Sequence, residues 1–139
     1  MPLRAVMDTN VLYAGLRSQK GASAAVLQAL LRDEWRLILS NTVLAEYEEV
    51  LKRESVTLDL SFAEVDRLLN ALCSVAERHS LSANWTPLLT DPADEAFAHL
   101  ATESQADCLV SYNLRHLEPV RRSGVNLLEP KAFLAILSV

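Results

Sequence analysis

Four acidic residues lie at the end of a predicted strand or at the start of predicted helices. Asp8 directly follows the apolar run 3–7, and Glu46 and Asp94 lie early in predicted helices, at the border of the apolar stripe. Asp91 directly precedes a proline, which is typical of a helix N-cap. Asp8 could equally cap a turn or helix, and the helix dipole alone favours early carboxylates such as Glu46.

Neighbouring acids on the same predicted helix show why Glu46 is singled out. Glu48 is followed one turn later by Lys52, and Glu49 by Arg53, so both acids are explained as solvated ion pairs. Glu46 has an apolar valine at the corresponding position. Its carboxylate is therefore expected to point along the sheet surface.

The chemistry that these residues favour is that of a hard divalent cation. Ser111, Tyr112 and Asn113 end the third predicted strand, at the sheet edge where parallel strands place their ligands. Converging carboxylates repel one another unless a cation lies among them. Oxygen ligands suit Mg²⁺ or Mn²⁺, whereas the three scattered histidines disfavour zinc. The residues thus indicate metal-assisted hydrolysis of a phosphodiester or phosphomonoester.

Alternating strands and helices must position these side chains. Strands are predicted at residues 3–7, 36–39, 108–111 and 125–128, with a short edge strand at 80–85. Helices are predicted at 23–31, 43–51, 61–77, 91–101 and 129–137, and residues 53–60 are expected to form a loop. This alternation predicts an α/β fold with a parallel sheet covered on both faces, in a single domain spanning residues 1–139.

Composition limits the class of protein. The chain has 139 residues, of which 50% are hydrophobic, which excludes a disordered chain. It shows no signal peptide or membrane span, and its two cysteines lie among apolar neighbours, so a soluble cytoplasmic protein is expected. The net charge of −5 argues against a nucleic-acid partner at first sight. Setting the four acids above aside leaves 14 acidic against 13 basic residues, so the acidity is largely explained by one metal site.

Four segments together resemble a known family. They are residues 7–12 (MDTNVL), 44–51 (LAEYEEVL), 91–97 (DPADEAF) and 106–117 (ADCLVSYNLRHL). In order and spacing they resemble the PIN domain, in particular the bacterial branch assigned to toxin components of toxin–antitoxin systems. The resemblance covers essentially the whole chain.

The resemblance implies a fold, an activity and partners. The fold would be a three-layer α/β/α Rossmann-like arrangement with a mainly parallel central sheet. The activity would be that of a Mg²⁺- or Mn²⁺-dependent endoribonuclease, with Asp8, Glu46 and Asp94 as catalytic metal ligands and Asp91 as an auxiliary ligand. The implied partners are an RNA substrate, an antitoxin protein and a second copy of the chain, with no membrane.

The chain departs from the family pattern at one point. Many PIN domains have a Thr-x-Asp signature where this chain has Ser111-Tyr112-Asn113. Ser111 keeps the hydroxyl, but Asn113 replaces a carboxylate and should weaken a second metal ion while remaining a candidate ligand. Asn10 is expected to support the site through hydrogen bonds.

Basic residues flank the predicted site, and they have two explanations. They are Arg115, His116, Arg121 and Arg122 after the third predicted strand, and Arg17 and Lys20 in the predicted loop after Asp8. They are either ordinary solvated charges or a basic rim for RNA, of which Arg17, Lys20, Arg115 and His116 are the candidate contacts. No aromatic stacking motif accompanies them, so base specificity cannot be inferred.

Two alternative functions remain open at this stage. A catalytically weak or inactive domain that binds protein or RNA would be consistent with Asn113. An aspartyl-nucleophile phosphatase would also begin with an apolar strand and an aspartate. That mechanism needs a second carboxylate two residues later, where this chain has Asn10.

Overall fold

All strands of the central sheet run in the same direction. In the computed structural model, which describes residues 2–138, the strand order is β3-β2-β1-β4-β5, and every neighbouring pair is parallel. The strands are β1 (Arg4–Met7), β2 (Arg36–Leu39), β3 (Glu77–Arg78), β4 (Cys108–Val110) and β5 (Asn126–Leu128). The expected parallel α/β sheet is confirmed.

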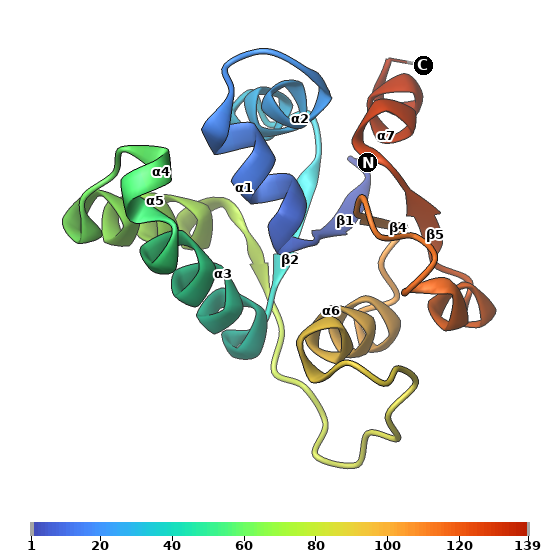
Figure 1. Cartoon of the computed structure of the whole chain (residues 1–139). Helices are drawn as coiled ribbons and strands as arrows, with labels where there is room; N and C mark the ends of the chain where they lie inside the picture. Colours follow the sequence, from blue (N-terminus) through green and yellow to red (C-terminus); the bar gives the residue numbers. More distant parts are fainter. Residues whose placement is uncertain (1, 139) are drawn as a thin grey trace.

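Helices cover both faces of this sheet (Figure 1). They are α1 (Thr9–Arg17), α2 (Ala22–Leu31), α3 (Asn41–Arg53), α4 (Ser55–Leu58), α5 (Phe62–Val75), α6 (Pro92–Glu103), the 3-10 helix η1 (Glu118–Ser123) and α7 (Pro130–Leu137). Helices α1, α2 and α7 gather on one side, and α6 lies on the other. Within the described range, none of the helices has the length and hydrophobicity that a membrane span requires.

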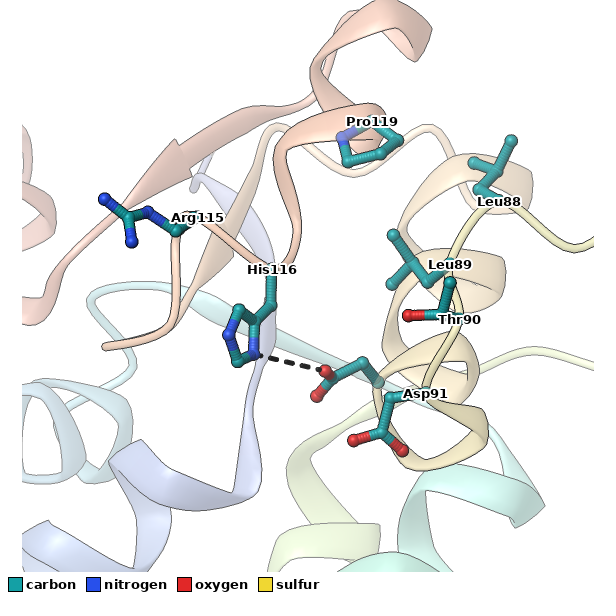
Figure 2. Close-up of a pocket in the computed structure, with 8 residues that line it drawn as sticks. Leu88, Leu89, Thr90, Asp91, Arg115, His116 and Pro119 are labelled. Carbon is teal, nitrogen blue, oxygen red and sulfur yellow. Dashed lines mark ion pairs between the residues drawn. The ribbon is translucent and has the colours of Figure 1, made fainter.

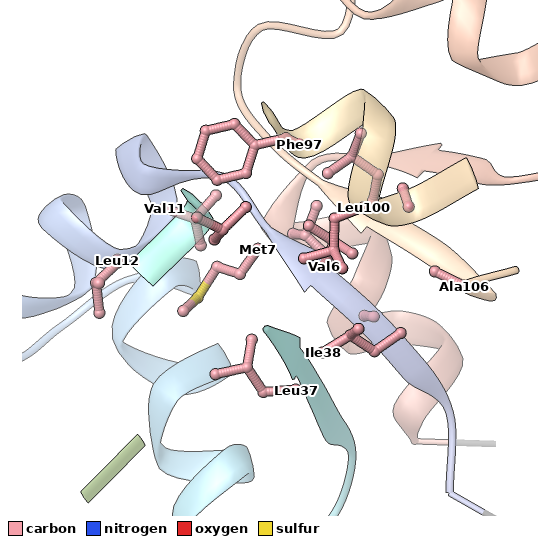
Figure 3. Close-up of a cluster of buried hydrophobic side chains, with 14 of the residues drawn as sticks. Val6, Met7, Val11, Leu12, Leu37, Ile38, Phe97, Leu100 and Ala106 are labelled. Carbon is pink, nitrogen blue, oxygen red and sulfur yellow. The ribbon is translucent and has the colours of Figure 1, made fainter. Parts of the chain in front are cut away.

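The hydrophobic core forms where the helices pack on the two faces of the sheet. The three central strands bury consecutive rather than alternating side chains, among them Val6, Met7 and Ile38, as strands with helices on both faces should. Helix α6 adds Phe97 and Leu100 from above β1 (Figure 3). Burial of each side chain of this size contributes roughly 1.5–3 kcal/mol to the free energy of folding. The core therefore stabilises the strands up to their carboxyl ends.

The segment after Asp8 differs from the expectation. Sequence reasoning placed Arg17 and Lys20 together in a loop, but helix α1 begins at residue 9 and ends with Arg17, and only Lys20 lies in the following turn. Helix α1 buries Val11 and Leu12 against the core. Tertiary packing thus stabilises a nine-residue helix whose short apolar pattern merges with the preceding strand.

Three shorter segments also differ. The edge strand expected at 80–85 is wrong, because the edge strand is the two-residue β3 at Glu77–Arg78. A strand of two residues is too short to show the alternating hydrophobic pattern of a strand. The helix predicted at 61–77 ends at Val75. The predicted loop 53–60 contains the single-turn helix α4, which Asp59 ends in the left-handed conformation.

Arg4 ties the edge of the sheet to its centre. Its Nε and Nη2 atoms donate to the two carboxylate oxygens of Glu77 at 2.9 and 2.5 Å, and it also donates to the backbone carbonyls of Ser104 and Gln105. The hydrogen bonds from Arg4 lower the pKa of Glu77 to about 2. This bidentate pair therefore links β1, β3 and the connection between α6 and β4.

The Glu77→Gln variant should lose this stabilisation in a pH-dependent way. Because the folded-state pKa lies below the ordinary value of 4.5, the stability is present above pH 4.5 and is lost as the pH falls toward 2. We expect the variant to have a free energy of unfolding lower by about 1–2 kcal/mol at pH 7. The difference should shrink below pH 4.5, as measured by urea unfolding at several pH values.

A surface pair provides the control for this variant. Glu34 lies 3.9 Å from Arg32, and both side chains are exposed. Glu34→Gln should change stability by less than about 0.5 kcal/mol. Equal effects of the two substitutions would show that the Arg4 pair has no special role.

Candidate active site at the carboxyl edge of the sheet

Asp8 lies at the point where the strand order reverses. From β1 the chain proceeds to β2 on one side, and β4 joins β1 on the other, so a crevice is expected at the carboxyl ends of β1 and β4. The Asp8 backbone N–H donates to the Val110 carbonyl at 2.9 Å and continues the strand pairing. The side chain is buried, and its Oδ2 accepts a hydrogen bond from Ser111 Oγ at 2.7 Å.

Ser111 is itself held by the residues around it. Its Oγ accepts from the Asn113 backbone N–H at 2.9 Å and from Asn10 Nδ2 at 3.4 Å. Asn10 Oδ1 accepts from the Tyr112 N–H at 3.4 Å. The Ser111 proton is therefore directed at Asp8. Asn113 is exposed and joins this cluster through its backbone N–H.

Helix α3 brings Glu46 to the same edge. The Ser40 side chain caps the helix by accepting from the Val43 N–H at 3.2 Å. The fully buried Tyr47 hydroxyl donates to the Met7 carbonyl at 2.5 Å, which fixes α3 against the end of β1. Glu46, next to this anchor, is partly buried.

Tyr47 is a residue whose positioning role sequence reasoning missed. The sequence pattern assigns Tyr47 to the apolar stripe of the predicted helix and indicates no partner for its hydroxyl. A buried tyrosine hydroxyl needs a hydrogen-bond partner, and that requirement is the signal that could have found it. Burial, and the charge of Asp8 secondarily, raise the pKa of Tyr47 well above its ordinary value, so the hydroxyl stays protonated and donates.

Helix α6 contributes Asp91 and Asp94. The Asp91 side chain accepts from the Ala93 N–H at 2.9 Å, and so it caps the helix. The Asp94 side chain is only 14% exposed, and its Oδ2 lies 3.9 Å from His116 Nδ1 (dashed line in Figure 2). The N-terminal end of α6 thus presents two carboxylates toward the segment after β4.

Burial and the charge of a neighbouring acid raise the pKa values of Asp8 and Asp94. The pKa of Asp8 is raised mainly by burial and further by the charge of Asp94, while the Ser111 hydrogen bond opposes the rise. Burial and the charge of Asp91 raise the pKa of Asp94, and His116 lowers it. Repulsion among Asp8, Asp94 and Asp91 is therefore only partly relieved by protein groups.

Of the acids at this edge, Asp91 is the one whose charge acts on Glu46. The pKa of Glu46 is raised first by partial burial and then by the charges of Glu49 and Asp91. Arg53 opposes the rise. The ion pairs expected for the neighbouring acids are present, with Glu48 bound to Lys52 and Glu49 to Arg53.

The oxygen donors of these acidic residues fit a hard divalent cation, but their side chains are spread apart. Within residues 2–138, no three His, Cys, Asp or Glu side chains are gathered closely enough to hold a metal ion as they stand. The available donors are carboxylate, amide and hydroxyl oxygens, which suit Mg²⁺ or Mn²⁺. The Glu46 and Asp94 side chains would have to turn toward Asp8 to complete such a site.

A cavity of about 490 Å³ opens beside these acids. Asp91 and Asp94 line it together with His116, and Figure 2 shows Leu88 and Pro119 at its outer end. Its lining also includes Arg115 but neither Arg17 nor Lys20, the other two arginine or lysine residues suggested as RNA contacts. The Arg115 guanidinium points away from His116 and Asp91 in this view.

The fold and site define a class: a parallel α/β protein with an acidic crevice at its topological switch point. A comparison with family models finds a PIN domain over residues 4–115. The chain therefore belongs to the PIN domain family, as the sequence motifs indicated. No curated protein matches the chain.

Solved structures with the same fold are distant in sequence. VapBC2 from Rickettsia felis bound to a promoter DNA fragment is 16% identical, over 90% of this chain and 97% of that chain, with a TM-score of 0.61. VapBC-1 from nontypeable Haemophilus influenzae is 14% identical, over 93% and 99%, with a TM-score of 0.64. FitAcB from Neisseria gonorrhoeae is 15% identical, over 91% and 98%, with a TM-score of 0.61. At these identities the likeness shows the fold.

Removal of the buried charge at position 8 should stabilise the metal-free protein. Because the folded-state pKa of Asp8 is raised above the ordinary value of 3.8, its ionisation costs stability, which is lost as the pH rises from 3.8 through the folded-state pKa. We expect Asp8→Asn to raise Tm at pH 7 by on the order of 2–4 °C, since the amide oxygen can still accept from Ser111. The gain should disappear at acid pH, as measured by thermal unfolding in EDTA.

The matched control removes an acid that is stabilised by a partner. Asp66 lies 2.9 Å from Lys52 on the surface, so Asp66→Asn should leave Tm unchanged or slightly lower. A fall in Tm for Asp8→Asn as well would contradict the description of Asp8 as a buried charge that its hydrogen bonds only partly compensate.

Proposed function

We propose that this PIN domain is a Mg²⁺- or Mn²⁺-dependent endoribonuclease and the toxin component of a toxin–antitoxin module. The observation that carries the proposal is the buried Asp8 at the switch point, whose charge repels that of Asp94 across the crevice. Such unrelieved repulsion is costly unless a cation occupies the space between the acids. Asp8, Glu46 and Asp94 are the proposed ligands, with Asp91 and Asn113 as auxiliary ones.

Each proposed ligand is supported by a neighbouring group of this chain. Ser111 would orient Asp8, Tyr47 would keep the helix bearing Glu46 against β1, and the α6 cap would fix the turn that bears Asp94. A bound Mg²⁺ or Mn²⁺ would supply an activated water and neutralise phosphate charge. His116 stands at the cavity wall, where it could donate a hydrogen bond to a phosphate oxygen.

An antitoxin partner follows from the same proposal. Solved structures that share this fold include VapBC and FitAB, which are toxin–antitoxin complexes. We therefore expect a small partner protein that inhibits cleavage, a cytoplasmic setting in which RNA is available, and self-association of the chain.

A second candidate function is a weakly active or inactive domain that binds RNA or protein. The observation in its favour is Asn113, which supplies an exposed amide rather than a carboxylate after β4. A phosphomonoesterase is less well supported, because Asn10 stands where the second carboxylate of an aspartyl phosphatase would be and is hydrogen-bonded to its neighbours.

Cleavage of single-stranded RNA tests the proposal. We expect the purified protein to cut RNA internally in Mg²⁺ or Mn²⁺ and to be inactive in EDTA. Asp8→Asn and Asp94→Asn should each lower the rate at least about 100-fold, because each removes a charged ligand from the site. Glu46→Gln should lower it strongly, whereas Glu48→Gln on the same helix, which removes only a surface ion pair, should not.

Three results would contradict the proposal in different ways. Full cleavage by Asp94→Asn would remove that residue from the site. Binding of RNA without cleavage at any metal concentration would favour the inactive domain. Release of phosphate from phosphomonoesters, with no action on RNA, would favour the phosphatase.

Metal binding can be measured without any substrate. We expect calorimetry to show Mn²⁺ binding to the native protein and at least about tenfold weaker binding to Asp8→Asn. The surface variant Glu48→Gln serves as the control. Equal Mn²⁺ affinities of the native protein and Asp8→Asn would overturn the metal site, whatever the result of the cleavage assay.

A further inference from the structure

A second cavity continues outward from the one beside the acids. It has a volume of about 650 Å³ and shares two lining residues, Leu88 and Pro119, with the first. The two form one trench, here called the loop–η1 groove, between residues 84–91 and the helix η1. It runs from Asp94 at its inner end to Arg122 at its outer end.

The loop that forms one wall of this groove is held to α6 by hydrogen bonds. Glu95 on α6 accepts three hydrogen bonds from it, from Trp85 Nε1 at 2.5 Å and from the backbone N–H groups of Leu88 and Leu89 at 2.8 Å. The Trp85 ring also stacks on His99, with ring centroids 4.4 Å apart and planes 12° apart. Glu95 and the ring stack thus hold this surface loop against α6, and Glu103 also accepts from the Ser82 N–H at 2.8 Å.

The charges differ between the inner and the outer end of the groove. Two acids, Asp91 and Asp94, line the inner cavity together with Arg115, whereas Arg122 is the only charged residue that lines the outer one. In the part of the chain that the structure describes, Arg122 forms no ion pair, but the adjacent Arg121 binds Glu118 at 2.8 Å. One guanidinium is therefore free to meet an anion, and its neighbour is not.

The remaining lining of the outer cavity is apolar or neutral polar. Trp85, Leu88 and Pro119 supply apolar surface, and Thr102 and Ser123 supply hydroxyl groups. A cation beside apolar and aromatic surface is the combination that holds phosphates and unpaired bases together. A duplex would keep its bases stacked inside and make little use of such walls.

We propose that the loop–η1 groove binds the single-stranded RNA next to the scissile phosphate, with Arg122 contacting a backbone phosphate outside the catalytic site. The inference deepens the proposed ribonuclease function and rests on it. It is carried by the continuity of the groove with Asp94 and by the match between the free Arg122 charge and a polyanion. An RNA strand bound in this groove would run from the catalytic site toward η1 and away from Lys20 in the turn after α1.

RNA binding by a protein variant that is expected not to cleave the RNA tests the groove directly. Fluorescein-labelled single-stranded RNA of about 12 nucleotides is titrated against the Asp8→Asn protein, alone and combined with Arg122→Ala or Arg121→Ala. We expect Arg122→Ala to weaken binding about 3- to 10-fold and to lower the salt dependence by about one phosphate contact. Arg121→Ala, which removes a paired charge, should change affinity less than twofold.

Tryptophan fluorescence supplies an independent readout. The chain has two tryptophans, and Trp35 is 1% exposed in the core, so a change on RNA addition should come from Trp85. The change should vanish in Trp85→Phe, which keeps an aromatic ring against His99. Circular dichroism and Tm of each variant show whether the fold is intact.

The outcomes separate the groove from the proposed function. Equal effects of the two arginine substitutions, an unchanged Trp85 signal, or no RNA binding would overturn the groove. Cleavage by otherwise native Arg122→Ala with unaltered KM would also overturn it and would leave the ribonuclease proposal standing. RNA binding that depends on Arg122, in a native protein that cuts no RNA, would refute the nuclease and retain the groove as a binding surface.

Discussion

One hydrogen bond organises the carboxyl edge of the sheet. Ser111 donates to Asp8 at 2.7 Å across the boundary between β4 and β1, where the strand order reverses. Parallel pairing of consecutive buried residues aligns the two strand ends, and the core beneath them leaves Asp8 almost no access to water. The buried carboxylate is thus a consequence of the topology. The fold can tolerate its charge only with a partner such as Ser111 or a cation.

The elements around Asp8 add charge to it and little compensation. Helix α3 is fixed against β1 by the hydroxyl of Tyr47, and α6 is fixed by the cap of Asp91. Each helix therefore delivers a further carboxylate toward the same edge, and among the described residues His116, at 3.9 Å, is the basic side chain nearest to Asp94. Stability is supplied elsewhere, by the core and by the pair of Arg4 with Glu77. This division, a stable body with an electrostatically costly edge, is typical of a functional site.

The sequence predicted what depends on composition and position, and missed what depends on tertiary contacts. The buried strand before Asp8, the cap at Asp91 and the parallel sheet follow from apolar runs, a proline and alternation. Helix α1 was missed because its apolar pattern continues that of the strand. The strand expected at 80–85 is a loop that Glu103 holds at Ser82 and Glu95 holds at Trp85, through hydrogen bonds that the local sequence pattern does not predict. The role of Tyr47 likewise required knowledge of its partner on β1.

The central claim is that a divalent cation belongs between Asp8 and the α6 carboxylates. Crystals grown with Mn²⁺, with diffraction data collected at the manganese absorption edge, test it most directly. We predict an anomalous peak within bonding distance of Asp8, with the Asp94 and Glu46 side chains turned toward it at about 2.0–2.3 Å. A structure at saturating Mn²⁺ with no peak at Asp8, or with the ion bound only to surface acids such as Glu48 and Asp66, would contradict the account.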